Sequence, residues 1–315
     1  MSLQYAAAVV FPGQGSQRIG MGRDIHDAYR ECRRVFERAS DALRLDMRAL
    51  CFAQNDMLAM TEFTQPAILT VEIAIYEVLK EQYGFLPRYF AGHSLGEYAA
   101  LVAADVLPFE VALLIARKRG ELMQRAVPAG EGAMAAIIAE EIPYEDLQES
   151  CRHNGCEIAN YNSPQQAVIS GMAKNVDAAM TAFQYSLPAA RAVMLDVSAP
   201  FHSSLMRPAE IEFSRQLEHY RHHFNYQNAQ QVLSNYTGVF HSGLTLRSSM
   251  TGQISGAVRW IENMHALIGV AGEILEVGPQ RVLSRFFRSV GKEVSCISDL
   301  RSLEKVFRQE LAHGQ

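Results

Sequence analysis

The sequence predicts an α/β protein in which a compact second unit interrupts a large domain built on a parallel sheet. The first observation is that short apolar runs alternate with segments at helical spacing, which is typical of a parallel sheet covered on both faces. The second is a strand–helix–strand–strand–helix–strand series within about 65 residues, the βαββαβ order of ferredoxin-like units. The chain has 315 residues, which is long enough for a large α/β domain with such an insertion.

The large domain begins with a buried strand. Tyr5 to Phe11 is a short apolar run that ends at Pro12-Gly13, which predicts a strand running into a loop. A helix is expected from about Gly22 to Leu43. Another is predicted from Phe63 to Tyr83, where apolar positions recur at helical spacing.

A sharp turn connects the second strand to the next helix. Tyr89 to Ala91 reads as a short strand, Gly92 to Gly96 as the turn, and Glu97 to Ala104 as the start of a helix. A further helix is predicted from Phe109 to Ala126, because prolines bound it on both sides.

The inserted unit follows a loop rich in small residues at 127–132. Its predicted strands are 133–138, 157–160, 167–170 and 190–197, and its predicted helices are 143–151 and 176–183. We therefore expect a ferredoxin-like subdomain at residues 130–198 and a large domain at residues 1–129 plus 199–315. After the insertion, strands are expected at 231–234 and 274–277, with helices near 208–220 and 258–267.

Composition and cysteine spacing disfavour several classes of partner and location. The formal net charge is -5 and no basic run is present, so nucleic acid and anionic membranes are poor candidate partners. No apolar stretch reaches the ~18 residues that a membrane span needs, and Met1 to Phe11 carries no evident signal peptide. The five cysteines are irregularly spaced, which is typical of free thiols in a reducing cytoplasm. We therefore expect a cytoplasmic protein.

The segment Gly92-His-Ser-Leu-Gly96 contains the pattern G-x-S-x-G. After a strand and before a helix, this pattern predicts a nucleophilic serine, because the two glycines permit a turn that exposes the hydroxyl of Ser94 above the sheet edge. The helix N-terminus adds oriented N–H groups that stabilise an oxyanion, and the N–H of Leu95 is the natural donor. The alternative is a tight turn with a capping serine.

A nucleophilic serine needs a base, and His202 is the best candidate. A strand ends there and a loop begins, which places it at the edge where ligands bind in open α/β folds. We interpret His93 as structural, because its side chain should project away from Ser94. The histidines of segment 219–223 lack an ordered metal-ligand pattern, so no metal site is expected. No obvious triad carboxylate appears between the serine and the base.

Several motifs in chain order carry a family resemblance. They are Phe11-Pro-Gly-Gln-Gly-Ser-Gln17, Thr64-Gln-Pro-Ala67, Gly92-His-Ser-Leu-Gly-Glu97, Arg119-Gly-Glu-Leu-Met123, Gly132-Ala-Met-Ala-Ala136, Asn160-Tyr-Asn-Ser-Pro164, Pro200-Phe-His202, Gln253 with Val258-Arg-Trp260, and Glu276-Val-Gly-Pro279. From Phe11 to about Leu300 the chain resembles the malonyl-CoA:acyl carrier protein transacylases of fatty acid and polyketide synthesis. The resemblance implies an α/β-hydrolase-like large domain with an inserted ferredoxin-like subdomain.

The resemblance also implies roles for individual residues. Ser94 is the expected nucleophile and His202 its base, oriented by a backbone carbonyl near Gln253 instead of by a carboxylate. The oxyanion hole is expected from the N–H groups of Gln14 and Leu95. These roles account for the missing triad acid.

Arg119 and Phe201 are implied to select the substrate. Alone, Arg117-Lys118-Arg119 reads as a charged helix face, but the resemblance singles out Arg119. Its guanidinium is expected to bind the free carboxylate of a malonyl group through a bidentate pair that a lysine cannot match. In modular polyketide acyltransferases a Phe before the histidine accompanies malonyl, because the ring fills the space of an α-methyl group.

We therefore expect a transferase that carries malonyl from malonyl-CoA to the phosphopantetheine thiol of an acyl carrier protein through a malonyl-serine ester. No metal or redox cofactor is expected. The nearest alternative is an acyl hydrolase that clears acyl groups from carrier proteins, and another is a non-catalytic docking module. The pathway is either fatty acid synthesis or supply of malonyl in trans to a polyketide synthase, and Pro200-Phe201 resembles the trans-acting type.

Overall fold

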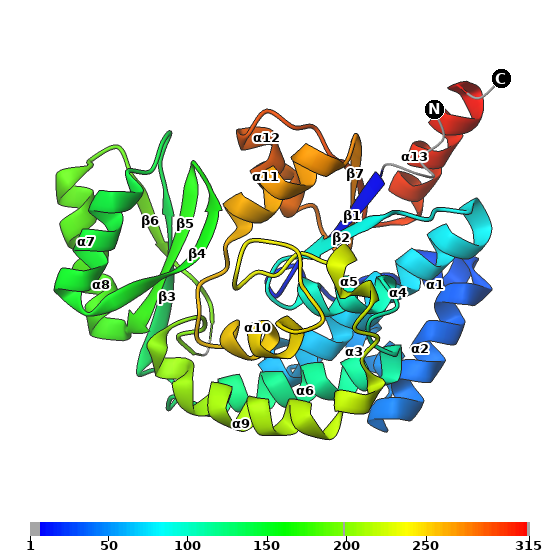
Figure 1. The fold of residues 1–315 in the computed structure, drawn as a ribbon, viewed down its shortest axis with the longest axis horizontal. Coiled ribbons are helices and arrows are strands. Elements are labelled where there is room, and N and C mark those ends of the chain that lie inside the picture. The colour runs from blue at the N-terminus through cyan, green and yellow to red at the C-terminus, as the bar shows by residue number, and fades with distance from the viewer. Residues whose placement is uncertain (1–6, 198, 314–315) are drawn as a thin grey trace.

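The computed structural model describes residues 7–197 and 199–313. These residues form two four-stranded sheets, which lie apart from each other in Figure 1. The strands are β1 (Ala7–Phe11), β2 (Tyr89–Gly92), β3 (Gly132–Ile138), β4 (Cys156–Ser163), β5 (Gln166–Met172), β6 (Arg191–Met194), β7 (Glu273–Val277) and β8 (Ser295–Ile297). The helices are α1 (Arg23–Ala28), α2 (Arg30–Leu43), α3 (Met47–Phe52), α4 (Thr61–Tyr83), α5 (Gly96–Ala103), α6 (Phe109–Arg125), α7 (Tyr144–Asn154), α8 (Ala173–Ser186), α9 (Arg207–His219), α10 (Leu246–Gly252), α11 (Trp260–Val270), α12 (Leu283–Ser289) and α13 (Leu300–His313).

The first sheet has the order β2-β1-β7-β8, and all of its pairings are parallel. Its central strand alternates, because Val9 and Phe11 pack into the core shared with α2, α4, α5 and α6, whereas Ala8 and Val10 pack with α11 and α12. The predicted parallel sheet with both faces covered is thus confirmed. Since parallel strands end at the same edge, the loops after β1, β2 and β7 meet there.

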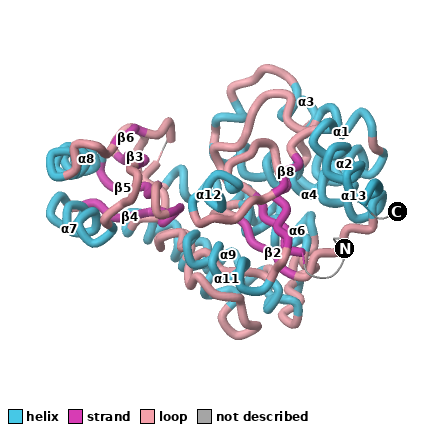
Figure 2. The backbone as a smooth tube through the Cα atoms, turned by 90° about the horizontal axis from the view of Figure 1, so that it is seen from above, coloured by secondary structure: helices cyan, strands magenta, loops and turns pink. Residues whose placement is uncertain are grey.

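The second sheet has the order β4-β5-β3-β6, and its neighbours are antiparallel. Helices α7 and α8 cover one of its faces, and in Figure 2 they lie at the end of the molecule far from the first sheet. Alternation along β3 explains this arrangement. Ala135 and Ile137 point into the core with these helices, while Met134 and Ala136 line a cavity on the opposite face.

The predicted helix from Gly22 to Leu43 is wrong as a single element. The chain breaks at Tyr29, whose backbone is extended (φ -118, ψ 132), so that α1 and α2 are separate helices. Arg33 Nη1 donates to the carbonyl oxygens of His26 and Asp27 at 2.9 Å, which satisfies acceptors that the break leaves free. No glycine or proline marks this break in the sequence.

The predicted strand Gln231–Ser234 is also wrong. Val232 forms only an isolated parallel bridge to Phe90 at the outer side of β2. The last strand of the insertion is shorter than expected, at Arg191–Met194, and residue 198 lies outside the described residues, as do residues 5 and 6 of the first predicted strand. The sequence did not predict β8, α3, α10, α12 and α13.

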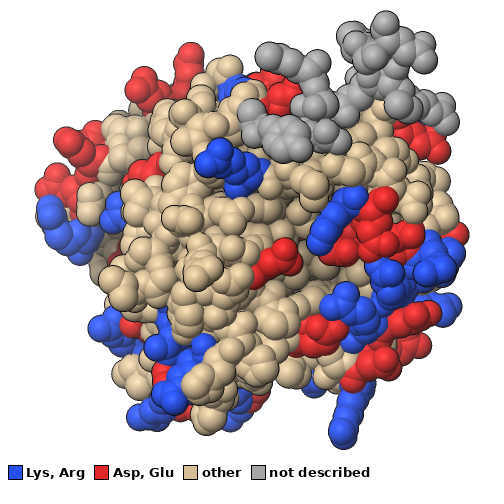
Figure 3. Space-filling view, turned by 45° about the vertical axis from the view of Figure 1, so that its right-hand side comes forward, with Lys and Arg blue, Asp and Glu red and all other residues tan. Residues whose placement is uncertain are grey.

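The surface carries charges of both signs. On the face drawn in Figure 3, acidic and basic side chains are interspersed around broad uncharged areas. Among the described residues, no helix has both the length and the apolar character required to cross a membrane.

Candidate active site

The turn after β2 holds Ser94 in a strained conformation. Its φ is 52°, in the left-handed region that residues other than glycine rarely adopt. A Cβ at Gly92 would lie 1.9 Å from the carbonyl carbon of Gly96, and one at Gly96 would lie 2.1 Å from the carbonyl oxygen of Phe11. The two glycines are therefore required by close backbone contact, and the geometry is that of a nucleophile turn between a strand and a helix.

His202 lies beside this serine. Ser94 Oγ is 2.7 Å from His202 Nε2, and His202 Nδ1 is 2.8 Å from the carbonyl oxygen of Gln253. Because a carbonyl only accepts, Nδ1 carries the proton and Nε2 is left free to accept one from the serine. Burial, together with the positive charge of Arg119, lowers the pKa of His202 from 6.5 to about 3. The imidazole is therefore neutral at physiological pH.

No carboxylate among the described residues is hydrogen-bonded to His202. The carbonyl of Gln253 occupies the place that an acid takes in a Ser-His-Asp triad. A carbonyl fixes the ring and its tautomer in the same way, but it contributes a dipole instead of a full charge.

Arg119 is the third group at the serine, and it is fully buried, with 1% of its surface exposed. Its Nη2 donates to Ser94 Oγ and to Gln253 Oε1, both at 3.0 Å, and its Nη1 donates to Gln65 Oε1 at 2.9 Å. The guanidinium carbon also lies 5.5 Å from the centre of the Tyr98 ring. No described carboxylate forms an ion pair with it, and its Nε has no hydrogen-bond partner. A buried cation held by neutral groups is poised to bind an anion.

The backbone N–H groups of Gln14 and Leu95 are both free. Neither donates a hydrogen bond to any part of the chain that the structure describes, although the N–H of Ser94 donates to Asn235 Oδ1 at 2.6 Å. Gln14 lies in the loop after β1, and Leu95 directly follows the serine at the start of α5. Two free donors on the loops that flank a nucleophile are the composition of an oxyanion hole.

A cavity of ≈ 370 Å³ opens above these groups. The first sheet contributes its loops, and the second sheet contributes the face not covered by helices. Phe201 lines it while only 6% exposed, which fits a side chain that restricts the space beside His202. The lining includes Gln14, Ser94, Arg119, Met134, Ala136, Asn160, Val168, Phe201, His202 and Phe286.

The structure thus brings together the residues singled out in the sequence: Gln14, Ser94, Leu95, Arg119, Phe201, His202 and Gln253. His93 also lines the cavity, but its Nε2 lies 2.7 Å from Asn162 Oδ1, which provides a partner other than the serine. His219, His222 and His223 lie at the end of α9 and in the turn after it. Within the described part of the chain, no group of three or more potential metal ligands is found.

Sequence reasoning missed a second layer of polar side chains below the serine. Glu97, Asn235 and His241 are buried and hydrogen-bonded to one another or to the turn. Asn235 Nδ2 donates to the carbonyl of Gly92 at 2.6 Å, so this layer holds both ends of the serine turn. The available signal was Glu97 itself, a charged residue in the otherwise apolar helix α5.

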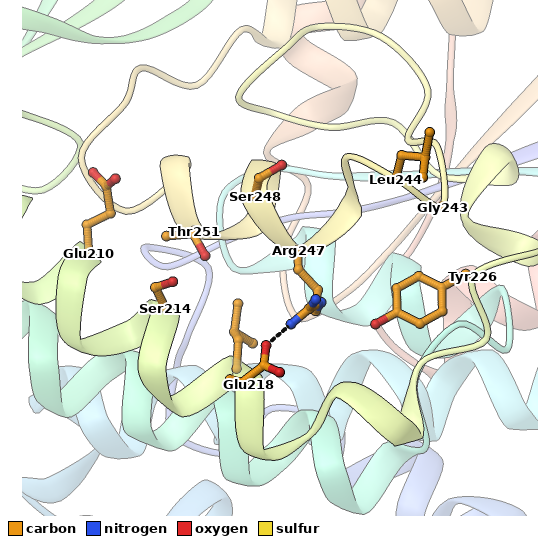
Figure 4. Close-up of a pocket in the computed structure, with 10 residues that line it drawn as sticks. Glu210, Ser214, Glu218, Tyr226, Gly243, Leu244, Arg247, Ser248 and Thr251 are labelled. Carbon is orange, nitrogen blue, oxygen red and sulfur yellow. Dashed lines mark hydrogen bonds and ion pairs between the residues drawn. The ribbon is translucent and has the colours of Figure 1, made fainter.

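A second, larger cavity of ≈ 670 Å³ lies between α9 and α10 (Figure 4). Arg247 projects into it and forms an ion pair with Glu218, as the dashed line shows. Glu218 also pairs with Arg221 at 2.8 Å, and Glu210 accepts from Arg207. The charged groups here are already paired, and no nucleophile with an adjacent base lines the cavity.

The fold and the serine–histidine–arginine site together define a serine acyltransferase, and the comparisons with known proteins agree. The model of the acyl transferase domain matches residues 8–241. A malonyl CoA-acyl carrier protein transacylase of Bacillus subtilis (strain 168) is 39% identical over 94% of this chain and 95% of its own. One from Staphylococcus aureus (strain MRSA252) is 35% identical over 95% and 96%. The chain belongs to the malonyl CoA-acyl carrier protein transacylase family.

Solved structures extend this likeness to three dimensions. The crystal structure of the transacylase from Clostridium perfringens has a TM-score of 0.90 with 34% identity and covers 98% of both chains. A malonyl-transacylase in complex with its type II PKS acyl-carrier protein has a TM-score of 0.88 with 36% identity, and covers 95% of this chain and 97% of that one.

Proposed function

We propose that this enzyme transfers a malonyl group from malonyl-CoA to the thiol of an acyl carrier protein through an ester on Ser94. The observation that carries the proposal is the buried, carboxylate-free guanidinium of Arg119, whose Nη2 is 3.0 Å from the nucleophile Ser94 Oγ. A thioester whose acyl group ends in a carboxylate places its carbonyl near Oγ when that carboxylate binds the guanidinium. The names of the relatives state the same donor and acceptor.

In the first half-reaction, His202 Nε2 accepts the proton of Ser94 Oγ while Oγ attacks the thioester carbonyl. The N–H groups of Gln14 and Leu95 stabilise the oxyanion that forms on the carbonyl oxygen. The carbon–sulfur bond then breaks, and the coenzyme A sulfur leaves with the proton from His202. The product is a malonyl ester on the serine.

In the second half-reaction, His202 accepts a proton from the pantetheine thiol of the carrier, and the sulfur attacks the ester carbonyl. Collapse of the intermediate returns the proton to Ser94 Oγ and releases the malonyl-carrier. No step of this cycle requires a metal ion or a redox cofactor, and we propose that none is used.

Binding of the substrate carboxylate changes the pKa of His202. The positive charge of Arg119 is the second cause, after burial, of the lowered pKa of His202. When a malonyl carboxylate binds Arg119, it neutralises this charge and raises the pKa of His202 toward the range in which general bases are effective. An acyl group without a carboxylate provides no such change. Phe201 excludes bulk beside the α-carbon, which favours malonyl over α-branched units.

We also propose the finer architecture. The parallel order β2-β1-β7-β8 with a nucleophile turn after β2 supports an α/β-hydrolase-like domain formed by residues 1–129 and 199–315. The antiparallel order β4-β5-β3-β6 with α7 and α8 on one face supports a ferredoxin-like subdomain at residues 130–198.

We propose that the enzyme serves fatty acid or polyketide synthesis, the two pathways that use an acyl carrier protein as the acceptor. The relative solved with its type II PKS acyl-carrier protein supports a polyketide role, in which the enzyme supplies a polyketide synthase with malonyl. The five free cysteines support a cytoplasmic location, because such thiols persist in reducing compartments.

Intact-protein mass spectrometry tests the first half-reaction. Mixing with malonyl-CoA should add one malonyl group to the wild-type enzyme and none to Ser94→Ala. A malonyl adduct on Ser94→Ala would remove Ser94 as the nucleophile.

The second half-reaction separates the transferase from the hydrolase. The malonyl-enzyme, freed of coenzyme A, is mixed with a phosphopantetheinylated carrier or with buffer alone. Transfer to the carrier should be faster than loss to water by orders of magnitude. Equal rates in the two mixtures would favour an acyl hydrolase.

A further inference from the structure

Glu97 is a buried carboxylate three residues after the nucleophile, at the start of α5, and only 1% of its surface is exposed. It is hydrogen-bonded to three residues that lie more than a hundred positions further along the chain. Oε2 accepts from Gln253 Nε2 and from the backbone N–H of Asn235, both at 2.8 Å, and Oε1 lies 2.9 Å from His241 Nε2. A carboxylate is suited to this place because it accepts on both oxygens.

The contact with Gln253 links Glu97 to the base and to the substrate-binding arginine. The backbone carbonyl of Gln253 orients His202, and its side-chain Oε1 accepts from Arg119. Its Nε2 donates to Glu97 and, at 3.1 Å, to the carbonyl of Ser94. An amide with both ends engaged cannot rotate without losing bonds at each end. Anchoring its Nε2 therefore fixes the residue that two catalytic groups share.

The contact with Asn235 links Glu97 to the nucleophile. Asn235 Oδ1 accepts from the N–H of Ser94 at 2.6 Å, and its Nδ2 donates to the carbonyl of Gly92 at 2.6 Å. These bonds hold a turn in which Ser94 has a positive φ. Strained backbone persists only where its surroundings hold it, so the anchoring of Asn235 is part of what keeps the hydroxyl raised.

We infer that Glu97 is a positioning residue. Through Gln253 and Asn235, it keeps the side chains of Ser94, His202 and Arg119 in their relative positions. The inference rests on the proposed function, because it assigns these three residues their roles. Glu97 touches no substrate and is not an acid of a triad. The side-chain amide of Gln253 bonds Arg119 through Oε1 and Glu97 through Nε2, so the two charged groups are bridged by a neutral amide instead of forming a direct ion pair.

The test compares acylation by two donors. The values of kcat/KM for Ser94 acylation by malonyl-CoA and by acetyl-CoA are measured by quenched-flow mass spectrometry. Acetyl loading depends on Ser94 and His202, whereas malonyl loading depends on Arg119 as well. Glu97→Ala should therefore lower malonyl loading about 100-fold and acetyl loading about 10-fold, because misplacement of catalytic groups is costly. The malonyl-to-acetyl ratio should fall about 10-fold.

Glu97→Gln should recover most of both rates. His241 Nδ1 is buried without a partner, so it can take the ring proton and leave Nε2 to accept from the new amide. All three contacts are then kept without the charge. If Glu97→Ala does not fold, Glu97→Asp replaces it. An aspartate is one methylene shorter, so its carboxylate no longer reaches Gln253 Nε2 and the backbone N–H of Asn235. The matched control is Glu72→Ala, another buried glutamate in this core, which should leave the ratio unchanged.

A double-mutant cycle supplies the second measurement. Because Glu97 acts through Asn235 as well as Gln253, Glu97→Ala combined with Gln253→Ala should load malonyl more slowly than either single variant. The combined loss should nevertheless be about tenfold smaller than the product of the two single losses, since both substitutions remove the same contact between Glu97 and Gln253. Multiplicative effects would overturn the inference. So would a Glu97→Ala, or Glu97→Asp, variant in which both donors slow equally, because that marks a merely structural role. A wild-type enzyme that fails to load malonyl would contradict the proposed function instead.

Discussion

The cavity beside Ser94 and the cavity between α9 and α10 each contain an arginine, but only one of the two is paired. Arg247 in the larger cavity is partly exposed and bonded to Glu218, whereas Arg119 in the smaller one is buried and held by neutral groups. A paired and hydrated cation has little left to offer a ligand. An unpaired buried charge, and not volume, therefore marks the site.

The largest expected effect comes from removing the unpaired cation. Arg119→Ala should lower kcat/KM for malonyl loading at Ser94 about 100- to 1000-fold, the loss of a charge-assisted, desolvated contact. Acetyl loading should stay within about tenfold of wild type. Competition between the two donors, followed by mass spectrometry, measures both. Equal losses for both donors would show that Arg119 does not recognise the carboxylate.

The pH profile of the same cavity gives the next effect. The pKa of His202 in the free enzyme is lowered to about 3, so the base remains neutral from there upward. We expect kcat/KM for malonyl loading to stay level between about pH 5 and pH 8 and to fall only in more acidic solution. Quenched reactions across this range measure the profile. A loss of half the rate near pH 6.5 would mean that Arg119 and burial do not lower the pKa of His202.

Glu72 is an unpaired buried group that lies outside both cavities. It lies in α4 with both carboxyl oxygens without a partner, and burial, with nearby Glu276, raises its pKa well above 4.5. The folded state therefore keeps a proton on Glu72 that the unfolded chain releases near pH 4.5. Stability falls as pH rises from 4.5 toward the raised pKa of the folded state. Glu72→Met removes the unsatisfied oxygens and should raise the free energy of unfolding by about 1–3 kcal/mol.

Urea unfolding of wild type and Glu72→Met at pH 5, 7 and 9 measures this difference. The difference in the free energy of unfolding between the two proteins should increase with pH, since only wild type carries the carboxyl. A difference that is constant or decreases would mean that Glu72 is ionised and paired in the folded state.

The smallest expected effect comes from the paired arginine. Arg247→Ala should change malonyl loading by less than twofold and the free energy of unfolding by less than about 1 kcal/mol, because exposed ion pairs contribute little. It is the matched control for Arg119→Ala. A loss comparable to that of Arg119→Ala would erase the distinction between the two cavities.

The sequence predicted the groups proposed to react better than it predicted the buried polar side chains that hydrogen-bond to them. Ser94 could be placed because a strand, two glycines and a helix start are local features. Arg119 could not be told from its neighbours locally, since Arg117 lies over Phe63 and Lys118 pairs with Glu121 on the same helix. Successive residues on a helix point in different directions, so burial of one side chain in three depends on tertiary packing.

The supporting layer could not be predicted because its contacts join distant segments. Glu97 bonds Asn235 and His241 across more than a hundred residues, and no spacing rule connects them. The break at Tyr29 was missed for a similar reason. It is stabilised by Arg33 on the following helix and carries no glycine or proline.

The face of β3 and β5 that lines the active cavity has a consequence for engineering. Met134, Ala136 and Val168 line the cavity beside Ser94 from the second sheet, whereas the hydrogen bonds to Ser94 and His202 come from outside that sheet. Libraries randomised at these three positions reshape the wall while the groups that make and break bonds keep their partners. The fold therefore offers directed evolution a place to change which acyl unit is accepted without rebuilding the chemistry.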